Sequence, residues 1–174
     1  SIGIIDTLHL AEVARSAKIL CSSPSFSTSS KVGVRQWFQT YLTWINTHEY
    51  GIREKNHPNN HGVCWSLQAA SFADFVGEDE ILQWIREQFK SVYLKEMMDE
   101  SGGFPAELAR TKPYGYSLFV IDAMAGVAQI VSTEADDLWE FQLPDGRGMH
   151  RGMRFILPYI KDKSAWPFPR DIMY

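Results

Sequence analysis

The sequence lacks several features that would assign it at once to a class of protein. It contains 2 cysteines in 174 residues, too few to indicate a redox compartment or a disulfide framework. No apolar run approaches the roughly 20 residues that a membrane helix needs. Positive charge is not in excess either, because the net charge is −4, and this argues against a broad nucleic-acid surface.

The motifs of several large enzyme classes are also missing. We find no serine nucleophile elbow, no P-loop and no dinucleotide-binding fingerprint. No carboxylates are obviously paired for glycoside hydrolysis, although three stay candidates for it: Asp136, Asp137 and Glu140. The sequence therefore gives no support to serine-nucleophile, P-loop or dinucleotide-dependent chemistry.

Apolar residues, in contrast, are plentiful enough for one sizeable core. Hydrophobic residues make up 45% of the chain and aromatic residues 13%, so we expect a single domain over residues 1–174. The chain starts with Ser1 and shows no signal peptide, which predicts a mature or truncated chain. Cys21 and Cys64 are expected to be buried thiols, with a disulfide between them as the alternative.

Helical periodicity dominates the chain and predicts an all-α fold. Gly77 fits the C′ position of the third helix, and Pro158 should end or kink the sixth. The polar segment 47–59 is predicted to be a loop. Asp6 or Thr7 is expected to cap the first helix, and a sixth helix is predicted over 150–160. The residues expected to face inward, given helix by helix for the first five, are Leu8, Val13, Ala17 and Leu20; Trp37, Phe38, Tyr41, Leu42 and Ile45; Leu67, Ala70, Ala73 and Phe75; Ile81, Ile85, Phe89 and Val92; and Leu118, Ile121, Met124 and Val127.

The predicted loops differ in length, and no strand pattern stands out. A short link around Gly77 alternates with long loops at 47–59 and 98–112. This alternation suits helical hairpins stacked side by side, with the long loops gathered on one rim. Functional residues tend to lie on such loops, so both long loops and the helix starts after them contain candidates.

The first candidate site is the segment 59–62, Asn-Asn-His-Gly, at a predicted helix start. An Asn there is an ordinary N-cap, which explains one of the two amides. Gly62 weakens a first helical turn but allows a ligand to approach the backbone closely. Asn60 and His61 are then expected to face an anion at the helix N-terminus. His57 lies four residues before His61, but a proline places it outside the helix, so no metal site is expected.

The second candidate site is the Gly- and Pro-rich stretch 102–117, which enters another predicted helix. Arg110 offers a planar fork that suits a carboxylate, and Glu107 lies within its reach if that short turn is helical. A Glu–Arg pair that only ties the loop down is the alternative. Tyr116 is either a core residue or, beside cations that stabilise its anion, a usable base.

Together the two segments supply an amide, an imidazole, a guanidinium and a phenol. This set suits removal of a carbon-bound proton next to a carboxylate, which must first be neutralised. Asn60 and Arg110 are the candidates for neutralisation. Tyr116 or His61 can take the proton, and a phenol can return one to the leaving oxygen.

The stretches NNHGVCWSLQAASFADFVG and GFPAELARTKPYGYSLFVIDAM resemble the alginate lyase superfamily of polysaccharide lyases. Its members carry Asn-Asn-His-Gly at a helix start. Downstream they have a Pro-x-Glu-Leu-x-Arg-Thr segment and then a Tyr that opens the next helix. Both elements occur here in order, and the resemblance covers roughly residues 5–161, most strongly 55–125.

The resemblance implies an (α/α) toroid, here its C-terminal portion, because a family toroid needs more helices and the missing ones would precede Ser1. It implies cleavage of mannuronate-rich alginate or β-1,4-glucuronan by β-elimination, without metal or cofactor, leaving a 4,5-unsaturated uronate end. By matching, Asn60 and Arg110 would neutralise the uronate carboxylate. Tyr116 would be the acid and base on sugars whose proton and leaving oxygen share one face, and His61 would assist.

Four further residues are expected to bind substrate: Lys112, Tyr114, Trp65 and Glu107. The chain departs from many family members at two places. An aromatic residue follows the Asn-Asn-His-Gly motif one position later than usual, and Tyr114-Gly115 replaces an aromatic–His pair. Both departures bear on the preferred sugar more than on the reaction.

The expected partner is an acidic polysaccharide or oligosaccharide, with neither nucleic acid nor membrane involved. A polymeric substrate predicts a secreted or periplasmic protein. Two other functions stay open: an (α/α)-toroid glycoside hydrolase and a non-catalytic helical carbohydrate-binding domain. Ultraviolet absorbance of an unsaturated product separates a lyase from a hydrolase, and a Tyr116→Phe variant separates a lyase from a binding domain.

Overall fold

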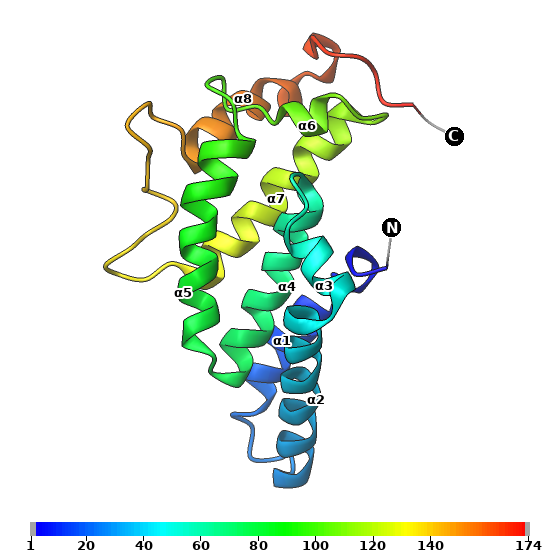
Figure 1. Cartoon of the computed structure of the whole chain (residues 1–174), viewed down its shortest axis with the longest axis vertical. Coiled ribbons are helices and arrows are strands. Elements are labelled where there is room, and N and C mark those ends of the chain that lie inside the picture. Colours follow the sequence, from blue (N-terminus) through cyan, green and yellow to red (C-terminus); the bar gives the residue numbers. More distant parts are fainter. Residues whose placement is uncertain (1–2, 173–174) are drawn as a thin grey trace.

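The chain folds into helices joined by loops (Figure 1). The computed structural model describes residues 3–172. Within that range the only β pairing is an isolated bridge between Thr133 and Asp136, so the all-α prediction is confirmed. The elements are η1 (Ile5–Thr7), α1 (Leu10–Leu20), α2 (Thr28–Thr47), α3 (Glu49–Lys55), α4 (Asn60–Val76), α5 (Asp79–Gln88), the π-helix η2 (Phe89–Met97), α6 (Pro105–Leu108), α7 (Pro113–Val131), α8 (Met149–Lys161) and η3 (Lys163–Ala165).

Helix α4 is the centre of the packing. It lies against α1, α2, α3, α5 and α7, and nearly all of its side chains are buried. Small residues such as Ala69 and Ala73 alternate with large ones such as Phe72, which lets neighbouring helices approach closely. The first turn of α4, which holds the first candidate segment, is therefore fixed by contacts with several elements.

Helix α7 is the second core helix. Its 19 residues are long and apolar enough, by length and composition alone, to cross a membrane, so the chain comes closer to a membrane-length run than expected. However, Val120, Met124 and Val127 are buried in the core, and a core helix passes the same test. The helix is thus weak evidence for a membrane segment.

The predicted inward face of α1 is only partly right, since Ala17 is buried as expected. The buried residues are Ala11, Ala14 and Ala17, whereas Val13 and Leu20 are about half exposed. Alanines allow α1 to lie close against α4, so the face with the smallest side chains is turned inward.

The expected cap of α1 is also wrong, because this helix begins at Leu10 without a side-chain cap. Thr7 donates a hydrogen bond to the side chain of Gln68 in α4 instead.

In α2, Phe38, Leu42 and Ile45 are buried as predicted, but Trp37 is half exposed. Ile85, Met124 and Val127 hold their predicted inward positions in α5 and α7, and Gly77 has the left-handed conformation expected after α4.

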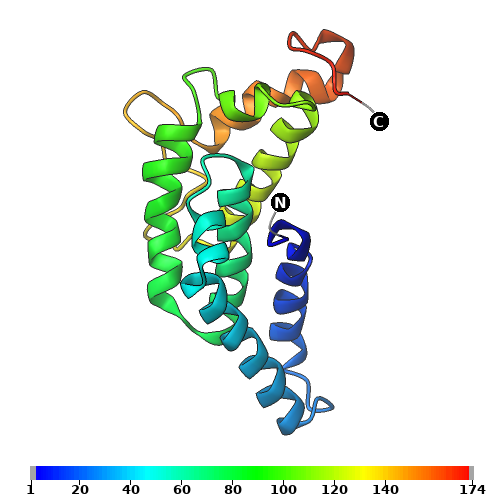
Figure 2. The same cartoon turned by 45° about the vertical axis from the view of Figure 1, so that its right-hand side comes forward.

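The segment 47–59 is not a loop, since it contains α3. Gly51 favoured the loop prediction, but it is buried within α3, where a Cβ atom would lie 2.1 Å from the carbonyl oxygen of Ile45. The glycine thus permits close contact between α3 and the end of α2. Figure 2 shows α3 following α2 and lying against α4, which places Glu54 on a packed helix.

The C-terminal segment packs over the start of α7. Helix α8 contains Pro158 and ends three residues later at Lys161. The tail packs through its aromatic residues, with the centroid of the Trp166 ring 5.0 Å from that of Tyr159 and 5.3 Å from that of Tyr114. Figure 1 shows this segment at the same end of the molecule as α6.

Candidate active site

The start of α4 is organised by a cap and a glycine. Asn59 is the N-cap, and its side-chain oxygen accepts a hydrogen bond from the N–H of His61 at 3.0 Å. A Cβ atom on Gly62 would lie 2.5 Å from the carbonyl oxygen of His57. The close approach that needs glycine is therefore made by the chain itself, which corrects the expectation that Gly62 makes room for a ligand.

The N-terminus of α4 is occupied by a carboxylate of the same chain. Glu107 accepts hydrogen bonds from the backbone N–H of Asn60 at 2.6 Å and from Asn60 Nδ2 at 2.7 Å. The helix amide and dipole that were expected to face a bound anion thus serve Glu107. Since Glu107 is fully buried, its predicted contact with substrate is corrected to a positioning role.

Asn60 is fully buried beside Glu107. We expected its side chain to be directed toward a ligand at the helix start. This expectation is wrong, because Asn60 Nδ2 donates its hydrogen bond to Glu107. Its Oδ1 has no hydrogen-bond partner among the described residues. Leaving a buried polar atom unpaired costs about 1–3 kcal/mol. This oxygen is therefore a buried acceptor that has no partner beside Glu107.

Arg110 joins Glu107 to Tyr116. Because α6 is a single helical turn, Arg110 returns toward Glu107, with its Nη1 atom 3.4 Å from Oε2. The predicted Glu–Arg pair is thus formed. On its other side, the guanidinium carbon lies 3.5 Å from the centroid of the Tyr116 ring. The Arg110 side chain is 28% exposed, so it can contact a ligand.

His61 is held by Glu54, a residue that the sequence analysis did not select. The Nδ1 atom of His61 lies 2.6 Å from Oε1 of Glu54, which is only 4% exposed. An ionised carboxylate only accepts hydrogen bonds, so a neutral imidazole paired with it has its proton on Nδ1 and Nε2 as the acceptor. Glu54 was missed because its segment was predicted to be a loop. Recognising α3 would have placed Glu54 on a helix, whereas its contact with the start of α4 depends on tertiary packing.

The start of α7 is capped from the far end of the chain. The carboxylate of Asp171 accepts hydrogen bonds from the N–H groups of Tyr114 at 2.9 Å and Gly115 at 3.1 Å. No local pattern indicates a cap 57 residues away. The Tyr114 hydroxyl donates to the carbonyl of Tyr159 at 3.3 Å, and its ring is partly exposed. Substrate contacts by Tyr114 and by the preceding Lys112 stay predictions.

Trp65 belongs to the core. Its side chain is fully buried, and its indole N–H donates to the carbonyl of Ile45 at 3.0 Å. The ammonium of Lys55 lies 4.9 Å from the Trp65 ring and 3.7 Å from the Trp84 ring, and partial burial lowers the pKa of this lysine. The prediction that Trp65 stacks on a sugar is therefore wrong, because its ring is buried.

Cys64 is a free, buried thiol in the first part of α4. Cys21 is free as well, so both are thiols as predicted and the disulfide alternative is wrong, but only Cys64 is buried. Burial is the main factor that raises the pKa of Cys64 to about 12, and the carboxylates of Glu54 and Glu107 add to it. This thiol stays protonated near neutral pH and does not supply a nucleophile.

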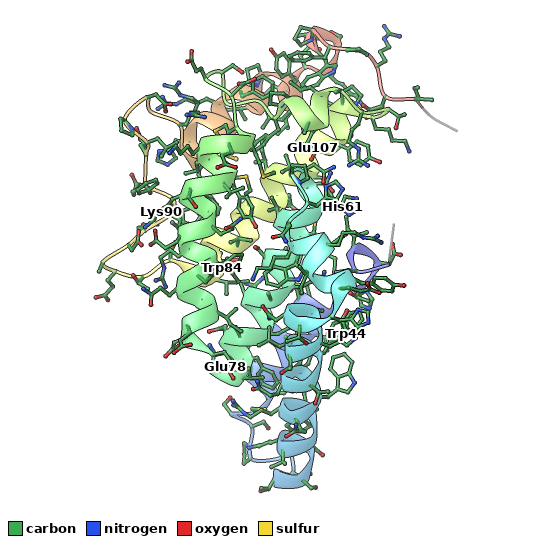
Figure 3. All side chains as sticks on the ribbon, in the orientation of Figure 1. Trp44, His61, Glu78, Trp84, Lys90 and Glu107 are labelled. Atoms are coloured by element: carbon green, nitrogen blue, oxygen red, sulfur yellow. The ribbon has the colours of Figure 1, made fainter. Side chains whose placement is uncertain are left out.

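The structure thus brings three of the predicted catalytic residues into one chain of contacts. Asn60 binds Glu107, Glu107 pairs with Arg110, and Arg110 covers the ring of Tyr116. His61 follows Asn60 directly. Figure 3 shows His61 and Glu107 at the same end of the molecule, on different elements. A guanidinium, a phenol and an imidazole backed by buried carboxylates are groups suited to proton transfer beside a bound anion.

Comparison with known proteins identifies the family to which the chain belongs. The family model described as alginate lyase matches residues 1–166, so the chain belongs to the alginate lyase family. An alginate lyase from Bacteroides ovatus superposes with a TM-score of 0.89 at 28% sequence identity, covering 98% of this chain and 45% of that one. The predicted family and the predicted (α/α) toroid are thereby confirmed.

More distant structures share the fold. Alginate lyase A1-III from Sphingomonas species A1 matches with a TM-score of 0.70 at 19% identity, over 92% of this chain and 48% of that one. A variant of alginate lyase A1-III complexed with a tetrasaccharide matches equally well at 18% identity, over 92% of this chain and 49% of that one. No curated protein matches. The chain spans about half the length of these structures, and the expected further helices before Ser1 stay a prediction.

Proposed function

We propose that the chain is part of a polysaccharide lyase that cleaves a uronic-acid polymer by β-elimination. The observation that supports this most directly is the run of contacts from Asn60 through Glu107 and Arg110 to Tyr116. Membership of the alginate lyase family supports the same reaction class. The reaction needs neutralisation of a carboxylate, removal of a proton and protonation of a leaving oxygen.

Arg110 is the group that meets the uronate carboxylate. It is the partly exposed member of its pair with Glu107, and a guanidinium binds a carboxylate with two parallel hydrogen bonds. Asn60 acts behind it by holding Glu107 through its side-chain amide. Pairing the carboxylate with Arg110 makes the proton on the adjacent ring carbon more acidic.

Tyr116 transfers the protons, and His61 assists. As a phenolate, Tyr116 takes the proton from carbon 5 of the uronate, and the electron pair forms the double bond between carbons 4 and 5. The bond from carbon 4 to the bridging oxygen breaks, and the phenol returns a proton to that oxygen. The guanidinium of Arg110 covers its ring, which fixes the place of the phenol beside the carboxylate-binding group. The Nε2 atom of His61 is an acceptor for a substrate hydroxyl or for the proton of the phenol.

The proposed substrate is mannuronate-rich alginate or β-1,4-glucuronan. In both sugars the proton and the leaving oxygen lie on the same face of the ring, so a single phenol can serve both steps. The related variant complexed with a tetrasaccharide supports an oligosaccharide ligand at this fold. Secretion or a periplasmic location follows from a polymeric substrate outside the cell.

Glycoside hydrolysis is less compatible with this site. It needs two carboxylates that flank one glycosidic bond. The two carboxylates nearest to the candidate residues, Glu54 and Glu107, are both buried and engaged with His61 and Asn60. They position other groups and do not face a sugar.

A panel of uronate polymers tests the proposal. The chain is incubated with mannuronate-rich alginate, guluronate-rich alginate, β-1,4-glucuronan and a neutral glucan, and ultraviolet absorbance of the unsaturated product is followed. Absorbance should rise with a mannuronate or glucuronate polymer and stay flat with the neutral glucan. New reducing ends without absorbance would show hydrolysis, and polymer binding without either signal would show a binding domain; each result contradicts the proposal.

A further inference from the structure

A cavity of about 350 Å³ lies between the start of α7 and the C-terminal segment. Its lining residues are Tyr114, Lys163, Ser164, Trp166, Arg170 and Asp171. The volume is in the range of ligand sites, about 300–1,000 Å³. None of the proposed proton-transfer residues lines it, so the cavity is separate from the reacting groups.

The cavity has uncompensated positive charge in a chain whose net charge is negative. Lys163 and Arg170 are exposed, and neither forms an ion pair within residues 3–172. The nearby carboxylate of Asp171 is directed to the N–H groups at the start of α7. Two cations therefore face the cavity while its one anion is already bonded.

The wall of the cavity is aromatic. Tyr114 and Trp166 pack edge to face with their ring centroids 5.3 Å apart, and Tyr159 packs edge-on against Trp166. The ammonium of Lys163 lies 4.3 Å from the centroid of the Tyr114 ring. Rings held in this way offer a rigid apolar surface to the C–H groups of a sugar, and the cations offer partners to its carboxylate.

We propose that this cavity is a second binding site for a uronate unit, distinct from the place of bond cleavage. The inference rests on the proposed function, because it takes the ligand to be the same acidic polymer. Tyr114 lies two residues before Tyr116, and helix residues at that spacing do not face the same side. The cavity therefore holds a unit of the polymer that lies away from the reacting ring.

The test compares binding of mannuronate oligosaccharides to the chain and to the double variant Lys163→Ala/Arg170→Ala. Both side chains are exposed, so the fold should be kept, and circular dichroism checks this. A long oligosaccharide should bind the double variant about fivefold or more weakly, because two ion pairs with carboxylates are lost. The matched control is Lys161→Ala, an exposed cation at the end of α8 that does not line the cavity.

The outcomes separate this inference from the proposed function. Equal affinity of the double variant and the unmodified chain would overturn the cavity site, and so would an equal loss in Lys161→Ala or for a neutral oligosaccharide of the same length. If the double variant alone loses affinity while the chain produces no unsaturated product, the cavity site stands and the lyase proposal fails. If product forms but affinity is unchanged, the lyase proposal stands and the cavity site fails.

Discussion

Glu54 and His61 form a carboxylate–imidazole pair between α3 and α4, with Oε1 of Glu54 2.6 Å from Nδ1 of His61. The carboxylate is buried and the imidazole is mostly covered, at 5% and 17% side-chain exposure. The orientation of the ring is therefore set by the packing of two helices before any substrate binds. In the proposed mechanism this pair keeps Nε2 as the acceptor that faces the sugar.

Replacing Glu54 by Gln should lower turnover by about tenfold or more, because the carboxylate that orients the imidazole is lost. KM should change little, since Glu54 itself does not contact the sugar. Initial rates of absorbance increase at several substrate concentrations measure both constants. Glu49→Gln, an exposed change on the same helix, is the control, and full turnover in Glu54→Gln would contradict the assigned role.

Glu107→Gln should reduce the free energy of unfolding by about 2 kcal/mol. The new amide presents a donor where the two N–H groups of Asn60 need acceptors, and the charge that pairs with Arg110 disappears. Urea denaturation followed by circular dichroism measures the change. The exposed substitution Glu134→Gln should leave the midpoint in place. Identical midpoints for both variants would show that Glu107 does not hold the start of α4.

Gly62→Ala and Gly33→Ala should change stability in opposite directions. At Gly62 the new methyl group would meet a backbone carbonyl, which should cost about 1–3 kcal/mol. At Gly33, in the exposed face of α2, nothing lies within 4 Å of the added atom, and alanine should stabilise the helix by about 0.5–1 kcal/mol. Thermal unfolding of the two variants checks this, and a Gly62→Ala variant as stable as the unmodified chain would be contrary to the packing described.

Cys21 should react with a thiol-labelling reagent well before Cys64. Burial and nearby carboxylates raise the pKa of Cys64 to about 12, so its reactive thiolate is nearly absent up to about pH 10. Cys21 is only partly buried. Mass spectrometry of peptides after labelling at pH 8, in native buffer and in urea, distinguishes the two sites. Rapid native labelling of Cys64 would mean that the start of α4 opens readily.

Local sequence patterns predicted much of the fold because the core helices are strongly periodic. The buried residues of α7 and the left-handed Gly77 follow from spacing and backbone preference alone. Helix α3 did not follow, since Gly51 indicates a break unless the contact with Ile45 is known. The inward face of α1 was predicted only at Ala17, because alanines are selected there by the closeness of α4.

The candidate site could be predicted only in part. The pairing of Glu107 with Arg110 follows from their spacing on one helical turn. That Glu107 also occupies the N-terminus of α4 could not be predicted, because the two residues are 47 positions apart and no local signal connects them. Glu54 and Asp171 were missed for the same physical reason, since each acts on a backbone or side chain that tertiary packing brings to it.

The most direct measurement is elimination by Tyr116→Phe. Phenylalanine keeps a ring for Arg110 to cover, so the variant should fold and bind uronate oligosaccharides like the unmodified chain. With the hydroxyl gone, the rate of absorbance increase should fall by about 100-fold or more. A Tyr116→Phe variant that forms unsaturated product at the unmodified rate would contradict the proposed mechanism.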